Sequence, residues 1–178
     1  MVVSMPKLLA TLLLITLSQA GCNVQSTSEG AAAAPEDKSA TLITQAKAIH
    51  ASALTIDAHA DIEIPGKPSM YVGADGLSRV SPAKMHAGGL DAVVMSLAVG
   101  PMPRNPKGYA AAKALAQTKL AAVNALANDP VNNAIIVQTT EELQTAQTEG
   151  KAALILGFQN ALILGTNTTG IDELYDSG

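Results

Sequence analysis

The pattern of apolar and polar residues divides this sequence into short apolar runs and longer amphipathic stretches. Largely apolar runs cover residues 54–58, 90–99 and 151–160, and none of them alternates strictly between apolar and polar positions. Such short runs are typical of strands buried on both faces of a parallel sheet. Helical patterns alternate with these runs, at residues 40–53, 109–128, 141–149 and 169–177. The order predicts an α/β fold, built either as a (β/α)8 barrel or as a doubly wound sheet.

A long loop and several shorter signals separate these elements. Residues 63–82 contain several glycines and prolines and leave the carboxyl end of the first predicted strand, where functional lids are often built. Residues 81–89 predict a short helical turn that ends at a pair of glycines. Residues 133–138 predict a short extended segment, and one of the two threonines after it is the expected N-cap of the next helix.

The N-terminal residues have the pattern of an exported protein. A basic segment precedes an apolar run at residues 8–17, which has the length of a signal peptide and is short for a transmembrane helix. Small residues before Cys22 predict a lipoprotein signal over residues 1–21, with lipid attached to Cys22. Because Gln19 stands where such signals usually carry leucine, cleavage after Ala20 by an ordinary signal peptidase is the alternative.

Export predicts a protein in the periplasm, or one anchored to a membrane on the cell-envelope side. Residues 22–39 are rich in Ser, Gly, Ala, Pro and Glu, which predicts a flexible linker. Residues 40–178 predict a single domain with three strand–helix units. Since a complete barrel has eight such units, three units are too few to close a barrel.

Composition and charge exclude several functional classes. The chain of 178 residues has a formal net charge of -4, which argues against a surface that binds nucleic acid. Aromatic residues make up 2% of the chain and tryptophan is absent, so the core must be built from Ala, Leu, Ile, Val and Met. The single cysteine excludes an intrachain disulfide bond.

The candidate metal-binding side chains of this sequence follow the first apolar run. Alternation along a strand puts His59 and Asp61 on the same face, so that an imidazole nitrogen and a carboxylate oxygen can point at one place. This pair of donors suits a divalent ion such as zinc. The alternative is an exposed polar pair at a strand end, because His-x-Asp often occurs by chance.

The residues around this pair resemble a known family. Residues 47–61 are similar to the opening of the membrane dipeptidase family, also called renal dipeptidase or peptidase M19, in which a helix precedes a strand reading Asp-x-His-x-Asp. Residues 88–96 resemble its Gly-Gly-Val/Leu segment, and residues 174–178 its Leu-Tyr-x-x-Gly segment. The resemblance implies the N-terminal part of a (β/α)8 barrel of the metal-dependent hydrolase type, incomplete in this chain. It also implies a zinc-dependent dipeptidase that cleaves dipeptide amide bonds through a metal-activated water.

The same resemblance implies a set of metal ligands. His59 and Asp61 would bind the first zinc ion, and Asp57 would brace the site or, alternatively, accept hydrogen bonds from backbone N–H groups. The family has a bridging glutamate in a Gly-x-Glu segment, and Gln159 takes that place here. Because a neutral amide cannot offset the charge of two cations, we expect one tightly held zinc ion and at most a weak second one. The family's two later histidine ligands have no counterpart, and no catalytic side chain is assigned.

Two other functions stay open on the sequence. One is an exported binding or structural lipoprotein on a degenerate barrel scaffold, and the other is a single-metal amidohydrolase acting on another amide or ester. The expected partners are a small dipeptide, a membrane through lipid on Cys22, and a second copy of the chain in a homodimer, while this chain alone is expected to be inactive. Structural roles are expected for the remaining polar candidates His50, His86, Asp91 and Asn160.

Overall fold

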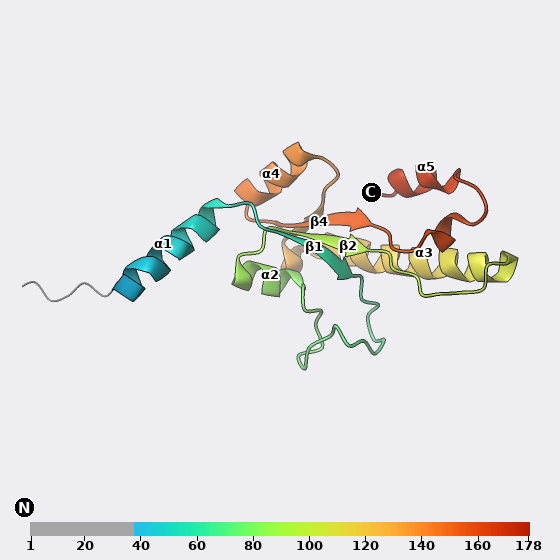
Figure 1. Cartoon of the computed structure of the whole chain (residues 1–178), viewed down its shortest axis with the longest axis horizontal. Coiled ribbons are helices and arrows are strands. Elements are labelled where there is room, and N and C mark those ends of the chain that lie inside the picture. Colours follow the sequence, from blue (N-terminus) through green and yellow to red (C-terminus); the bar gives the residue numbers. More distant parts are fainter. Residues whose placement is uncertain (1–37) are drawn as a thin grey trace, which may run out of the picture. The chain divides into compact units, whose positions relative to one another are not determined.

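A computed structural model of the chain describes residues 38–178, shown in colour in Figure 1. The predicted signal peptide at residues 1–21, the lipidation site Cys22 and nearly all of the predicted linker at residues 22–39 lie outside the described residues. Within residues 38–178, no helix is both long enough and apolar enough to cross a membrane.

Four parallel strands form one sheet. They are β1 (Ile56–Asp61), β2 (Ala92–Ser96), β3 (Ala134–Ile136) and β4 (Ala152–Gly157), in the order β1-β2-β4-β3. The predicted α/β class is therefore confirmed. The first strand begins and ends later than the predicted residues 54–58, so His59 and Asp61 belong to the strand itself.

Five helices accompany the sheet in the described residues, with bounds close to the predicted ones. They are α1 (Lys38–Ser52), α2 (Pro82–Gly88), α3 (Pro106–Asn128), α4 (Thr140–Thr148) and α5 (Gly170–Tyr175), with short 3₁₀ turns η1 (Pro130–Asn132) and η2 (Ala161–Leu164). The helix α2 ends at Gly89 with φ 67°, the left-handed conformation that favours glycine. The helix α4 begins in a capping box, in which Thr139 is the N-cap and Glu142 returns the hydrogen bond.

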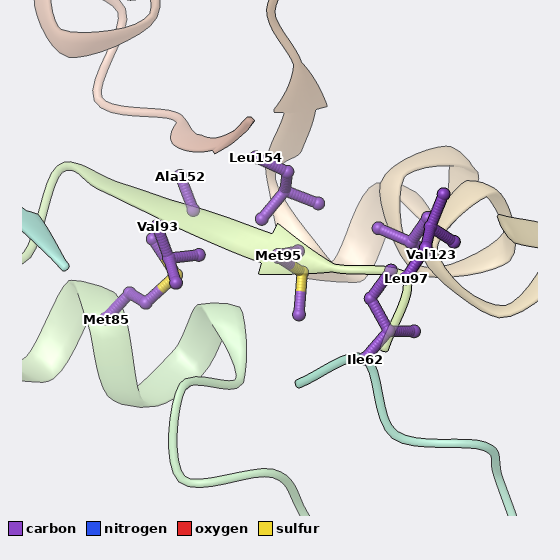
Figure 2. Close-up of a cluster of buried hydrophobic side chains, with 8 residues drawn as sticks. All are labelled: Ile62, Met85, Val93, Met95, Leu97, Val123, Ala152 and Leu154. Carbon is purple, nitrogen blue, oxygen red and sulfur yellow. The ribbon is translucent and has the colours of Figure 1, made fainter. Parts of the chain in front are cut away.

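The two central strands are buried on both faces. On one face, Val93 and Leu154 pack in a cluster with Met85 of α2 and Val123 of α3, which Figure 2 shows in close-up. On the other face, a second cluster joins strand residues to α4; it contains Ala92, Val137, Leu143, Ala146 and Ala153. Helices on both sides of β2 and β4 therefore explain why these strands are continuous apolar runs.

The prediction that every strand is buried on both faces is wrong for β1. Its Ile56 is 45% exposed, because β1 is an edge strand that pairs only with β2 in the described residues. The helix α1 also buries none of its residues, although its sequence predicts an apolar face. Thus β1, which carries His59 and Asp61, is less buried than its neighbour β2.

Candidate metal site at the carboxyl end of the sheet

A bulge in β1 determines how the candidate ligands are presented. Asp57 pairs with Val93, but Ala60 pairs with Met95, so β1 has one residue more than β2 in this interval. Bulges bend a strand and redirect its side chains, and they are common beside active sites. The backbone N–H of His59 donates a hydrogen bond to Asp57 Oδ1 at 3.0 Å. Asp57 therefore holds the backbone of the bulge at the position from which the imidazole projects.

His59 and Asp61 approach each other closely. Their Nε2 and Oδ1 atoms are 3.6 Å apart, and the side chains are 55% and 28% exposed. The Oδ1 atom of Asp61 is nevertheless buried and has no hydrogen-bond partner, which is costly for a carboxylate oxygen. Two donors bound to one tetrahedral zinc ion are roughly 3.3 Å apart. The spacing and the free oxygen both fit two ligand positions around one cation.

Gln159 lies at the same end of the sheet. Asp61 pairs with Ser96, and Ser96 pairs with Gly157, so these three residues lie side by side across β1, β2 and β4. Gln159 follows Gly157 by two residues, and its backbone oxygen accepts a hydrogen bond from Val99 N. A cavity of about 330 Å³ is lined by Gln159 together with Asp57, His59 and Asp61. The structure thus brings all the predicted site residues of the barrel domain to one cavity.

The described residues do not supply a complete ligand set for zinc. No group of three or more His, Cys, Asp or Glu side chains that could hold a metal ion occurs within residues 38–178. Zinc sites use three or four protein ligands, and here His59 and Asp61 provide two. The amide oxygen of Gln159 is a further candidate donor in the same cavity, but it carries no charge.

Sequence reasoning missed one wall of this cavity. Tyr71, Ser78 and Arg79, from the loop between β1 and α2, line it together with the ligand candidates. The sequence predicts a long loop at this place, where functional lids are often built, but assigns no functional residue to it. One available signal is that Arg79 is one of only two arginines in the chain, the other being Arg104.

The remaining polar candidates have structural contacts away from the cavity. Asp91 accepts hydrogen bonds from the backbone nitrogen and the hydroxyl group of Thr55, at 2.7 and 2.8 Å. Asn160 is the N-cap of η2 and accepts a hydrogen bond from Leu162 N. His50 is exposed on α1, and His86 Nε2 lies 3.4 Å from Asn132 O. The predictions of structural roles for Asp91 and Asn160 are therefore confirmed.

A parallel sheet with polar side chains gathered at its carboxyl ends is the arrangement used by α/β enzyme folds. Residues 43–178 match the sequence profile of the membrane dipeptidase family (peptidase family M19), and the chain belongs to this family. No curated protein matches the chain.

Two solved structures from Pseudomonas aeruginosa share this fold. The probable dipeptidase PvdM matches with a TM-score of 0.66 and 19% identity, over 78% of this chain and 36% of its own. An amidohydrolase matches with a TM-score of 0.54 and 20% identity, over 74% of this chain and 34% of its own. The chain thus spans about a third of the length of these proteins.

Proposed function

We propose that this chain contributes the first half-site of a zinc-dependent dipeptidase-type hydrolase, with His59 and Asp61 as ligands of one ion. Membership of the membrane dipeptidase family supports the hydrolase class. The observation that carries the metal assignment is the buried Asp61 Oδ1, which lacks a hydrogen-bond partner and lies 3.6 Å from His59 Nε2. A bound cation satisfies the lone pairs of both atoms at once.

Each residue of the cavity has a separate role in this proposal. When bound, zinc polarises a peptide carbonyl group and lowers the pKa of a water molecule toward about 7. His59 and Asp61 hold the ion, and Asp57 keeps the bulge in place through the N–H of His59. Gln159, which follows β4 at the same end of the sheet, lines the cavity and orients ligands by hydrogen bonds. Because it is neutral, it cannot reduce the repulsion between two dications, so the site holds one ion tightly and a second one weakly at most.

Metal titration of three variants tests this proposal. We expect the full-length wild-type protein to bind one Co²⁺ or Zn²⁺ ion, His59→Ala to lose it, and Gln159→Glu to raise the metal content toward two. Metal analysis and the absorption spectrum of bound Co²⁺ measure these changes. His86→Ala is the matched control, since His86 is exposed on α2 outside the cavity. Unchanged metal content in His59→Ala would show that the ligand assignment is wrong, and two tight ions in wild type would show that the role of Gln159 is wrong.

A binding lipoprotein on a degenerate barrel scaffold is the second candidate function. The finding that favours it is the missing third His, Cys, Asp or Glu ligand within residues 38–178. It differs from the first candidate in one measurement: the protein would bind a dipeptide without hydrolysing it, whatever metal is supplied. Release of free amino acids from a dipeptide by purified protein would exclude it.

We also propose that the protein is exported and carries lipid on Cys22. The support is the sequence alone, namely the basic start, the apolar run at residues 8–17 and the small residues before Cys22. Mass spectrometry of the mature protein tests both parts. Lipid on an N-terminal Cys22 supports anchoring, a free N-terminus at Gly21 excludes the anchor, and an uncleaved product excludes export.

A further inference from the structure

An apolar stripe runs along α1 and is not buried by any other part of residues 38–178. The helix buries none of its residues, and Leu42, Ile43 and Ile49 are 63%, 54% and 68% exposed. At 3.6 residues per turn, these three side chains and Ala46 fall within about a third of the helix circumference. We call these four residues the α1 stripe. An apolar stripe of this width on a helix normally faces a partner.

Two lysines lie on the borders of the α1 stripe. On a helical wheel, Lys38 lies next to Ile49 at one border, and at the other border Lys47 lies next to Ile43. Residues 38–52 contain no acidic side chain, although the whole chain has a formal net charge of -4. Among the described residues, neither lysine forms an ion pair. The exposed face of α1 therefore combines an apolar centre with two positive charges.

The place of α1 in the chain puts this stripe near the proposed membrane anchor. Residues 23–37 separate the predicted lipidation site Cys22 from α1, and they span at most about 50 Å even when fully extended. Lipid on Cys22 would therefore keep the α1 stripe within reach of a bilayer surface. Acyl anchors are commonly supported by a second membrane-binding signal close to them in the chain.

We propose that the α1 stripe binds the surface of a bilayer that contains anionic phospholipids. Its apolar side chains enter the boundary of the acyl chains, while Lys38 and Lys47 reach the phosphate groups, as long basic side chains do at such interfaces. Each lysine beside an anionic surface adds to the affinity. A second copy of the chain is a poorer occupant, because contact between two stripes brings the lysines of both copies together. Neither a metal ion nor lipid on Cys22 is required for this binding.

Binding through α1 also determines which end of the sheet faces the bilayer. Gln147 Nε2 of α4 donates to Ala53 O at 3.2 Å, and His50 Cε1 lies against Gly89, where a Cβ atom would be 2.8 Å away. These contacts attach the carboxyl end of α1 beside the amino end of β1, which begins at Ile56. The candidate site lies at the opposite, carboxyl end of the sheet, so the bilayer does not cover it.

Vesicle binding by the mature chain without lipid tests this proposal. Residues 21–178, made without the signal peptide, lack the apolar run at residues 8–17, which would bind bilayers by itself. We expect this chain to co-sediment with vesicles of equal parts phosphatidylethanolamine and phosphatidylglycerol, and to bind phosphatidylcholine vesicles more weakly. Lys47→Gln should weaken binding to the anionic vesicles roughly fivefold and leave binding to phosphatidylcholine unchanged.

A pair of double variants separates the α1 stripe from the opposite face of the helix. Leu42→Gln with Ile49→Gln should weaken vesicle binding roughly tenfold to a hundredfold, because two apolar side chains no longer leave water. Thr44→Gln with Ala48→Gln is the matched control, since it adds the same two glutamines to the other side of α1. Glutamine is a good helix former and α1 buries no residue, so both variants are expected to fold.

Tryptophan fluorescence reports which face of α1 meets the lipid. The chain has no tryptophan, so Leu42→Trp and Thr44→Trp each introduce a single reporter, the first on the α1 stripe and the second opposite it. We expect anionic vesicles to shift the emission of Leu42→Trp to shorter wavelength and to leave that of Thr44→Trp unchanged. No binding of wild type to anionic vesicles, equal weakening in both double variants, or equal spectral shifts would each overturn the proposal.

Sedimentation velocity without vesicles identifies the rival occupant. Self-association that Leu42→Gln with Ile49→Gln abolishes, in a wild-type chain that binds no vesicles, would assign the α1 stripe to a second copy instead. Absence of lipid on Cys22 in the exported protein contradicts the proposed anchor but leaves the vesicle result unchanged, so the two failures are distinguishable.

Discussion

Asp61 shows how a single residue can be unfavourable for stability and useful for binding. One of its carboxylate oxygens is buried at the end of β1 without a hydrogen-bond partner, and the buried hydroxyl group of Ser96, its neighbour on β2, also lacks one. A fold selected for stability alone would pair or replace such atoms. Their position beside His59 suggests that the cost is offset when a ligand binds.

Replacing the carboxylate of Asp61 should therefore separate stability from binding. We expect Asp61→Asn to stabilise the metal-free protein by about 1 kcal/mol, because it removes the charge from a buried oxygen that accepts no hydrogen bond. The same variant should lose the stabilisation that zinc gives to wild type. Thermal unfolding with a chelator and with zinc measures both effects, and Asp176→Asn, at an exposed position, is the control. A metal-free variant less stable than wild type would contradict this account.

Gly108, in the first turn of α3, is required by a close backbone contact. A Cβ atom at this position would lie 1.8 Å from Pro103 O, so the preceding loop would have to move. We expect Gly108→Ala to destabilise the protein by about 1–3 kcal/mol, the usual cost of overpacking. Gly88→Ala is the matched control, since its Cβ would meet nothing within 4 Å. Urea denaturation compares the two variants, and equal midpoints would show that the loop yields at little cost.

At the scale of elements, the stability of α4 depends on its N-terminal cap more than the stability of the longer helices does. It has nine residues and buries only Leu143 and Ala146, so its capping box is a large part of its local stability. Thr139→Ala should destabilise the protein by about 1 kcal/mol, because the backbone N–H of Glu142 loses its acceptor. Thr148→Ala, at the other end of α4, should have little effect. Chemical denaturation distinguishes the two, and an equal loss from both would argue against the cap.

Elements determined by local patterns could be predicted from the sequence. The Gly-Gly stop of α2 and the continuous apolar runs of β2 and β4 are examples, since each depends on neighbouring residues or on burial from both sides. The exposure of β1 could not be predicted, because it depends on how many strands lie beside it. The bulge that begins at Asp57 could not be predicted either, because a bulge is a mismatch in length between two strands that are far apart in the sequence.

Only the part of the candidate site that depends on local strand geometry or on the family resemblance could be predicted from the sequence. His59 and Asp61 are two positions apart on one strand, so their closeness follows from strand geometry, and the family resemblance adds Gln159. The cavity wall formed by Tyr71 and Arg79 depends on a hairpin closed by backbone hydrogen bonds and by Lys84. No periodic pattern marks such a loop, and so no sequence argument placed Arg79 beside the site.

At the scale of the whole described domain, the sheet has two open edges. The outer strands are β1 and β3, and β3 pairs only with the first half of β4, Ala152 to Leu154. Large apolar side chains are exposed nearby, among them Ile56 on β1 and Ile135 on β3. Open edges with exposed apolar residues are templates for pairing with another chain, and natural proteins usually protect them with charges.

We therefore expect the mature form of this 178-residue chain to associate with itself through the β1 edge as its concentration rises. Ile56→Lys should reduce this association, because a lysine on an edge strand opposes pairing of strands between molecules. Val131→Lys is the control, since Val131 is 88% exposed but lies in η1 outside the sheet, and both variants add the same charge. Sedimentation velocity over a range of concentrations measures the mass of each form. A wild-type protein that stays monomeric and unfolds in one cooperative transition would show that the edge is protected, and equal association in both variants would place the contact elsewhere.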